Sequence, residues 1–246
     1  MSLLEGKKAL VTGGSGAVGR VICQVLAKEG ADVAFNFDQN KQAAEEAVRM
    51  IEAEGAVALS YQVSVTDYQG VQQMVEDITS KFGHIDILVN NAGVTQVMPF
   101  ALIEEEDWDL LMDVNVKGTF ITTKAVLRGM IGQRYGRIVN ISSIAGIRML
   151  EVPVHYATAK AAIVGFTISL AQEVARYNIL VNCVVPGMLE VGISNNLTDR
   201  QRAEVLEHCS LGRAGKAEEV ANLIAFLASN KASYINGQSF VIDGGL

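Results

Sequence analysis

Short apolar runs alternate with stretches of helical periodicity along this sequence, and no other feature constrains the fold as strongly. The runs are rich in β-branched residues and lie at 8–12, 31–36, 56–63, 85–90, 137–142, 179–185 and 239–242. Between most of them, apolar residues recur every three or four positions, often up to a glycine. Because parallel neighbours need helical crossovers, the sequence predicts an α/β fold: a seven-stranded parallel sheet with helices on both faces.

The predicted helices and one long connection complete this pattern. The longest helices are predicted at 108–131 and 154–176, and others at 18–30, 41–54, 71–82 and 217–228. The segment 188–211 has no strand pattern, so we expect a mobile loop with a short helix that covers a ligand. No linker or repeat interrupts the chain, and residues 1–246 are therefore predicted to form a single doubly wound domain.

A glycine cluster stands where the first predicted strand meets its helix. The residues there are Thr12-Gly13-Gly14-Ser15-Gly16-Ala17-Val18-Gly19. Backbone N–H groups and the helix dipole at such a junction can hold a pyrophosphate. A glycine cluster elsewhere is usually a plain turn, but this position favours a dinucleotide site in a Rossmann-type fold.

Tyr156 and Lys160 are four positions apart in a predicted helix, so their side chains share a face. A phenol titrates near pH ~10, and a neighbouring ammonium that favours the phenolate would make it a proton shuttle nearer neutrality. The spacing alone is weak evidence. Ser143 supports it, because this serine follows a predicted strand end, where ligands of open α/β sheets bind. It either donates a hydrogen bond to a carbonyl oxygen or merely caps a loop.

Two further polar residues lie in predicted helices. Asn115 is a poor helix former, because its amide competes for backbone hydrogen bonds, and such a misfit can indicate function. His155 points about 100° away from Tyr156 around the helix, which favours a surface or packing role over that of a general base.

Composition excludes several classes of function. The formal charge is −7 and no run of Lys or Arg occurs, which argues against partners such as nucleic acid or an anionic membrane. The three cysteines lie far apart and have no ligand spacing, so neither a disulfide framework nor a metal site is expected. Charged residues follow Met1 closely, and no apolar stretch is long enough to span a membrane. We therefore expect a cytoplasmic protein that binds small molecules or copies of itself.

Taken together, the motifs resemble those of the short-chain dehydrogenase/reductase family over almost the whole chain. They occur in the family's order and comprise the glycine loop, Asn90-Asn91-Ala92-Gly93, Asn115, Ser143, Tyr156 with Lys160, Pro186-Gly187, and Asp243-Gly244-Gly245. The chain looks most similar to the 3-oxoacyl-[acyl-carrier-protein] reductases of fatty acid biosynthesis, which are NADPH-dependent homotetramers.

The resemblance implies a role for each site residue. Tyr156 would protonate a carbonyl oxygen, Lys160 would lower the pKa of Tyr156 and hold the ribose, Ser143 would position the substrate, and Asn115 would hold a water. Residues implied to bind the cofactor, besides Tyr156 and Lys160, are Gly13, Ser15, Gly16, Val18, Gly19, Phe37, Asp38, Ser64, Val65, Asn91, Ala92, Gly93, Pro186, Gly187 and Leu189.

Some positions depart from the family pattern and leave the cofactor open between NADPH and NADH. Ala17 replaces a glycine, and the remaining glycine spacing fits the epimerase branch, whose extra domain this chain is too short to hold. Gly16 stands where NADPH-preferring relatives often carry arginine. Asp38 would repel a 2′-phosphate, although the pair Asn36-Phe37 is similar to the NADPH group.

The sequence constrains the identity of the substrate less than it constrains the type of reaction. Of two basic positions that carrier-protein reductases use for docking, Arg134 matches one, while Tyr177, next to Arg176, occupies the other. Val191 replaces a threonine that commonly contacts the cofactor. The small residues Ala157, Ala161, Ala162 and Gly165 would allow close packing against a second copy, in line with a tetramer.

Three functions follow as hypotheses. The first is NAD(P)-dependent reduction of a 3-oxoacyl thioester, on a carrier protein or on coenzyme A. The second is dehydrogenation of a cyclic or aromatic secondary alcohol, because the sequence of the substrate loop at about 188–212 does not identify its ligand. The third is a non-catalytic, dinucleotide-binding regulator, which the presence of all four catalytic side chains disfavours.

Overall fold

The computed structural model describes residues 2–192 and 198–246 and contains a seven-stranded sheet. The strand order is β3-β2-β1-β4-β5-β6-β7, and every neighbouring pair is parallel. The predicted α/β fold and sheet are therefore confirmed. The strands are β1 (Lys8–Val11), β2 (Asp32–Phe37), β3 (Ala58–Gln62), β4 (Ile87–Asn90), β5 (Gly136–Ile141), β6 (Ile179–Pro186) and β7 (Ser239–Ile242).

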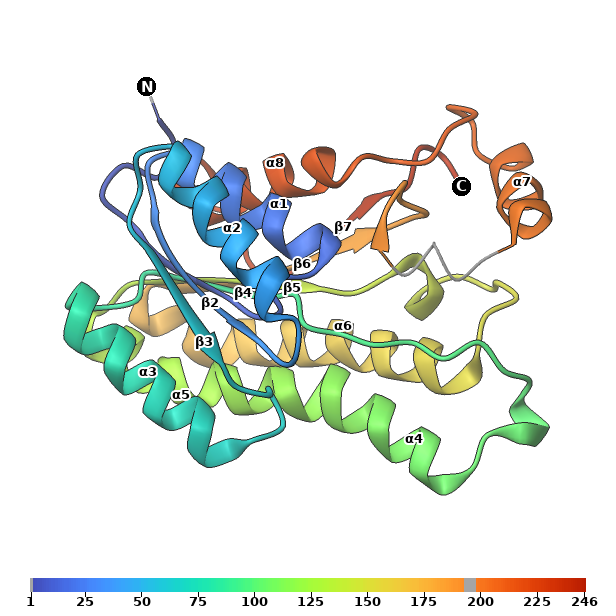
Figure 1. The fold of residues 1–246 in the computed structure, drawn as a ribbon, viewed down its shortest axis with the longest axis horizontal. Helices are drawn as coiled ribbons and strands as arrows, with labels where there is room; N and C mark the ends of the chain where they lie inside the picture. Colours follow the sequence, from blue (N-terminus) through green and yellow to red (C-terminus); the bar gives the residue numbers. More distant parts are fainter. Residues whose placement is uncertain (1, 193–197) are drawn as a thin grey trace.

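Helices cover both faces of this sheet (Figure 1). One layer holds α1 (Ala17–Lys28), α2 (Lys41–Ala53) and α8 (Ala217–Ala228), and the other holds α3 (Tyr68–Phe82), α4 (Glu105–Met112), α5 (Gly118–Gln133) and α6 (Val154–Val174). Short 3-10 turns join them at η1 (Phe100–Leu102), η3 (Ile144–Gly146), η4 (Ala175–Tyr177) and η6 (Asn230–Ala232).

Each face of the sheet buries its own half of the strand residues. In β1, Val11 belongs to the core cluster under α1 and α8, whereas its neighbour Leu10 belongs to the cluster under α3 and α5. The same alternation separates Phe35 from Ala34 in β2. Because successive side chains in a strand point to opposite faces, a continuous apolar run is what a sheet covered on both sides requires.

The prediction of a single helix at 108–131 is wrong in one respect. The structure has two helices there, α4 and α5, joined by a π-helical turn, η2 (Asp113–Lys117). Asn115 lies in this turn. Its Nδ2 donates to the Leu111 and Val94 carbonyl oxygens, at 2.9 and 3.1 Å, and its own carbonyl accepts from Thr119 Oγ1 at 2.9 Å. Side-chain groups thus take over backbone partners at the point where the helical ladder widens.

In the connection between β6 and α8, a residue near the start pairs with a residue near the end. Leu189 pairs with Gly215 in an isolated parallel bridge, in which the Glu190 N–H donates to the Gly215 carbonyl at 2.9 Å. The short helix expected in 188–211 is present as α7 (Asp199–Glu207), which Thr198 caps. The bridge closes the base of the segment, and near its returning end the Leu211 N–H also donates to the Gly244 carbonyl at 3.0 Å.

The helical segment 154–177 is long and apolar enough to cross a bilayer by length and composition alone. In the fold, α6 packs along β6 and against η3. Its buried side chains include His155, Tyr156, Lys160 and Ile163. We interpret it as a core helix that also carries site residues.

Candidate active site

The predicted site residues gather at the carboxyl edge of the sheet, where β1, β4, β5 and β6 end. Ser143 follows β5 and opens η3, and Tyr156 stands in the first turn of α6. Gly146 lets these two elements touch, because a Cβ there would lie 2.6 Å from the Ala161 backbone nitrogen. The close contact between η3 and α6 brings Ser143 to Tyr156 across thirteen residues of sequence.

The glycine loop is fastened to the ends of its neighbouring strands. The Gly13 N–H donates to Asn36 Oδ1 at 3.2 Å, and the Gly14 N–H donates to the Asn36 carbonyl at 3.0 Å. On the other side, Thr12 Oγ1 accepts from the N–H groups of Asn91 and Ala92, both at 3.0 Å. The loop and the Asn91 segment therefore form one rigid surface at the N-terminus of α1.

Two glycines of the loop are required by close approach. A Cβ at Gly14 would lie 2.7 Å from Cγ of the buried Phe35, and one at Gly19 would meet the Gly13 carbonyl oxygen and lie 2.9 Å from Asn91 Nδ2. Ala17, the departure from the family pattern, is the first residue of α1. The cradle thus fits a pyrophosphate approached by bare backbone.

We expect Gly19→Ala to lose nucleotide binding and about 2 kcal/mol of unfolding free energy, because the added methyl group pushes α1 away from the loop. Isothermal titration calorimetry and urea unfolding measure the two effects. Gly132→Ala is the matched control, since nothing lies within 4 Å of a Cβ there. The control should keep nucleotide binding and gain a little stability.

Tyr156 is nearly buried, in a cluster with Leu111 and Ala145. Burial raises the pKa of its phenol, and a hydrogen bond with the Ser143 side chain acts in the opposite direction. Ser143 Oγ also accepts from the Ala145 N–H at 3.2 Å, so the serine caps η3 as well. The capping interpretation of Ser143 is therefore confirmed, while donation to a carbonyl oxygen stays a prediction that is compatible with the cap, because one hydroxyl has two acceptor lone pairs and a proton.

Lys160, which the resemblance implies lowers the pKa of Tyr156, binds a backbone carbonyl in the structure, and its effect on Tyr156 stays a prediction. Its ammonium donates to the Ile141 carbonyl at 3.1 Å and lies 5.9 Å from the centroid of the Tyr156 ring. Burial of Lys160 lowers its own pKa to about 8, partly opposed by Cys183. The lysine is thus a group that exchanges protons close to neutrality.

Asn115 and Lys160 meet at Gly93. A Cβ at Gly93 would lie 2.7 Å from Asn115 Oδ1 and 3.4 Å from Lys160 Nζ. Asn115 Oδ1 is buried and has no hydrogen-bond partner among residues 2–192 and 198–246. A buried acceptor without a partner, next to an ammonium and a bare glycine, fits a site for a hydroxyl-bearing ligand such as a ribose.

Other predicted cofactor contacts differ in where their side chains point. Phe37 and Val65 are buried, Phe37 in the core cluster that includes residues of α1 and α2, and Val65 close to Gly118. Asp38 is exposed after the end of β2, and Ser64 Oγ pairs with Thr66 Oγ1 at 2.9 Å.

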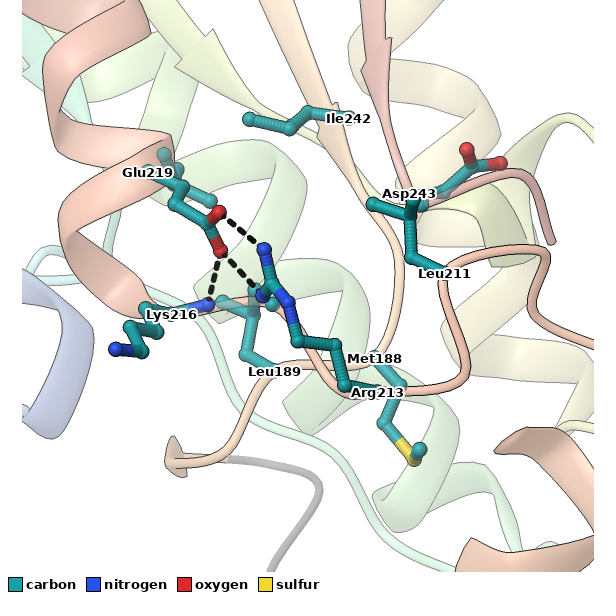
Figure 2. A pocket seen from close by; sticks show the side chains of 11 residues that line it. Met188, Leu189, Leu211, Arg213, Lys216, Glu219, Ile242 and Asp243 are labelled. Atoms are coloured by element: carbon teal, nitrogen blue, oxygen red, sulfur yellow. Dashed lines mark hydrogen bonds and ion pairs between the residues drawn. The ribbon is translucent and has the colours of Figure 1, made fainter.

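Sequence reasoning missed an ion pair beneath the substrate loop. Arg213 donates from two nitrogens to the two carboxylate oxygens of Glu219, at 2.7 and 2.9 Å, and the Lys216 N–H donates to the same carboxylate (Figure 2). The pair borders a pocket lined also by Leu189 and Ile242. It fixes the returning end of the loop to the start of α8. A basic and an acidic residue six positions apart give no recognisable spacing in the sequence.

The two positions considered for carrier docking lie at the opposite edge of the sheet. Arg134 Nη2 donates to the Arg176 carbonyl at 3.3 Å, and these residues precede β5 and β6. Ser143 follows the other end of β5. The structure therefore brings Arg134, Arg176 and Tyr177 together, but not near Tyr156.

No group of three His, Cys, Asp or Glu side chains that would hold a metal ion occurs in the part of the chain that the structure describes. The site instead combines a glycine cradle, the hydroxyls of the half-buried Ser143 and the nearly buried Tyr156, and the buried Lys160 at the edge of a doubly wound sheet. This combination defines an oxidoreductase that binds a nicotinamide dinucleotide and acts on a carbonyl or its alcohol.

Comparisons with known proteins agree with this class. The family model described as "Enoyl-(Acyl carrier protein) reductase" matches residues 14–246. The chain is 42% identical over 243 residues to a 3-oxoacyl-[acyl-carrier-protein] reductase of Thermotoga maritima, covering 99% of this chain and 98% of that protein. It is 40% identical over 244 residues to the Escherichia coli protein of the same name, covering 98% of each.

Among solved structures, a short-chain dehydrogenase/reductase from Serratia marcescens superposes with a TM-score of 0.93 at 35% identity, covering 99% of this chain and 98% of that one. The chain belongs to the short-chain dehydrogenase/reductase family.

Proposed function

We propose that this enzyme reduces a 3-oxoacyl thioester carried by an acyl carrier protein to the 3-hydroxyacyl form. The observation that carries the proposal is the contact between the hydroxyls of the half-buried Ser143 and the nearly buried Tyr156, which suits a carbonyl oxygen held between them. The family description and the relatives' names differ in the bond that is reduced, but both place the substrate on an acyl carrier protein. The hydroxyl pair favours a ketone, whose oxygen becomes an alcohol.

The side chains act on one oxygen atom and its proton. The nicotinamide supplies a hydride when it is bound. Ser143 donates a hydrogen bond to the carbonyl oxygen as negative charge develops there, and Tyr156 transfers its phenolic proton to that oxygen. Lys160, with a pKa near 8, returns a proton toward Tyr156, and Asn115 Oδ1 accepts from a hydroxyl or water beside Gly93.

Rates with matched substrates test this proposal. NADPH and NADH are each combined with acetoacetyl thioester, a 2-enoyl thioester and a panel of cyclic ketones, and nucleotide absorbance is followed. We expect the acetoacetyl thioester to be the best substrate. Turnover confined to cyclic ketones would favour the alternative, a dehydrogenase of cyclic or aromatic alcohols. No turnover of any substrate, with tight nucleotide binding, would favour the non-catalytic regulator.

We propose that both NADH and NADPH are accepted. Asp38 is exposed just beyond the strand end that holds Gly13, and Arg20 in α1 is paired with Glu46 at 3.0 Å. A carboxylate at this place suits a ribose 2′-hydroxyl and repels a 2′-phosphate. Lys41, exposed at the start of α2, acts in the opposite direction.

Asp38→Ala is expected to raise the ratio of kcat/KM for NADPH to that for NADH by about tenfold, because a negative charge near the 2′-position is removed. Steady-state rates with each nucleotide measure the ratio. Glu45→Ala removes an exposed carboxylate from α2 and serves as the control. An unchanged ratio in Asp38→Ala would place the 2′-group elsewhere.

The remaining parts of the proposal concern the chain as a whole. Residues 1–246 form one catalytic domain, and the segment at about 188–212 acts as the substrate loop. The enzyme is a cytoplasmic homotetramer that binds neither nucleic acid nor membrane. Since Arg134 and Arg176 lie far from Tyr156 in the same subunit, a carrier docked there would serve the site of a neighbouring copy. Sedimentation at working concentration tests the tetramer.

A further inference from the structure

His155 is a buried titratable residue for which the proposed chemistry has no use. It is the second residue of α6, immediately before Tyr156, and its side chain is fully buried. A surface position is therefore excluded, and the packing role expected from its direction on the helix is only part of what the contacts show.

The imidazole caps the turn of helix that carries Tyr156. His155 Nδ1 accepts a hydrogen bond from the Tyr156 backbone N–H, with a distance of 3.0 Å. The first four N–H groups of a helix have no acceptor within it, and Pro153, the N-cap of α6, has no side chain that can accept one. The ring of His155 thus supplies a cap that a serine or aspartate usually provides.

The same hydrogen bond fixes the tautomer of the ring. Because Nδ1 accepts, the proton of the neutral ring lies on Nε2. Burial lowers the pKa of His155, and the charge of Asp107 in α4 opposes this shift only in part. Because the pKa lies below its ordinary value of 6.5, the ring is neutral near pH 7. Nε2 is buried without a hydrogen-bond partner in the described ranges. Of the two ring nitrogens, Nδ1 is therefore the one that binds the helical turn of Tyr156.

The site is sensitive to the position of this turn. Tyr156 contacts Ser143 through its hydroxyl and packs in a cluster with Leu111 from α4 and Ala145 from η3. The phenol can serve a substrate oxygen only while it stays beside Ser143. Small displacements of a reacting group cost large factors in rate, so an anchor on the Tyr156 backbone has a catalytic effect without any contact to substrate.

We propose that His155 is a positioning residue, whose Nδ1 holds the first turn of α6 so that the Tyr156 phenol stays against Ser143. The inference rests on the proposed role of Tyr156. It concerns kcat more than nucleotide affinity, because the glycine loop and Asn91 lie on other elements and Lys160 stands one helical turn beyond Tyr156.

Two substitutions separate the two ends of the ring. In His155→Asn, Oδ1 occupies the place of Nδ1 and keeps an acceptor for the Tyr156 N–H. In His155→Gln, the amide reaches the place of Nε2 and the Nδ1 acceptor is lost. His155→Phe keeps the ring and loses both nitrogens. The three variants are assayed for kcat, KM, nucleotide affinity and melting temperature, with Tyr156→Phe as the reference.

We expect His155→Asn to keep kcat within about twofold, and His155→Gln and His155→Phe to lower kcat by about tenfold with KM and nucleotide affinity little changed. If His155→Phe fails to fold, the Asn and Gln pair alone decides. Equal kcat in Asn and Gln variants, or a kcat loss matched by lost nucleotide affinity, overturns the positioning role. If Tyr156→Phe keeps turnover, the proposed function itself fails, and that outcome is distinct from normal kcat in the His155 variants.

Discussion

Replacing Tyr156 by phenylalanine is expected to lower turnover by about 10² to 10⁴ while nucleotide binding persists. The substitution removes only the phenolic oxygen, the group proposed to transfer the proton, and keeps the ring that packs with Leu111 and Ala145. Single-turnover rates with an acetoacetyl thioester measure the chemical step, and fluorescence titration measures nucleotide binding. Both are needed, because a loss of binding would also lower the rate.

Tyr234→Phe is the matched control for this experiment. Tyr234 is fully exposed, so removal of its hydroxyl should leave rate and binding unchanged. Unchanged turnover in Tyr156→Phe would refute the assignment of the proton donor. It would also leave the burial of Tyr156 beside Ser143 as a matter of packing alone.

Lys160→Met is expected to abolish most turnover and, at the same time, to make the fold more stable. The pKa of Lys160 falls from its ordinary value of 10.5 to about 8, chiefly because burial disfavours the charged form. That difference corresponds to a cost of roughly 3 kcal/mol when the lysine is charged. The lost hydrogen bond to the Ile141 carbonyl offsets about 1 kcal/mol, so we expect a net gain of about 2 kcal/mol at pH 7.

The stability difference between Lys160→Met and the wild type is expected to depend on pH. Below pH 8 the lysine is protonated in both the folded and the unfolded chain, and the cost of its burial is fully present. Between about 8 and 10.5 the folded protein loses the proton first, so the stability of the wild type rises with pH. The advantage of Lys160→Met should therefore shrink toward pH 10. Urea unfolding at pH 7 and at pH 10 measures it.

Lys231→Met, at an exposed position, is the control for Lys160→Met. It should change neither the stability near pH 7 nor its slope with pH. A destabilised Lys160→Met protein would show that contacts of the lysine outweigh the cost of burying its charge. A group that lowers stability where it lies is typical of active sites, since function and not packing keeps it there.

Most of the fold was predictable because its signals are local and repeated. Strands buried on both faces are apolar along their whole length, as Leu10 and Val11 illustrate, and crossover helices have a different period. The order of the sheet was not predictable from these signals. The π-helical turn was missed, because it depends on contacts of Asn115 with Leu111 and Val94 that no periodicity encodes.

The sequence motifs predicted which residues form the site, but they did not predict the pKa values of those residues. Position in the sequence placed Ser143, Tyr156 and Lys160 at one edge of the sheet. The direction of the Lys160 side chain, toward the Ile141 carbonyl, and the burial that lowers its pKa both depend on tertiary packing. The same holds for the ring of His155, whose nitrogen faces the backbone of the next residue.

The bridge between Leu189 and Gly215 makes the segment between them a replaceable cassette. The ends of the cassette are continuous with β6 on one side and lead into α8 on the other, and Arg213 near its returning end pairs with Glu219 of α8. Loop-closure entropy grows only slowly with length, so insertions or exchanges between these two anchor points would cost the scaffold little. Substrate preference in such an enzyme can therefore be redesigned, by evolution or in the laboratory, without rebuilding the sheet that holds the chemistry.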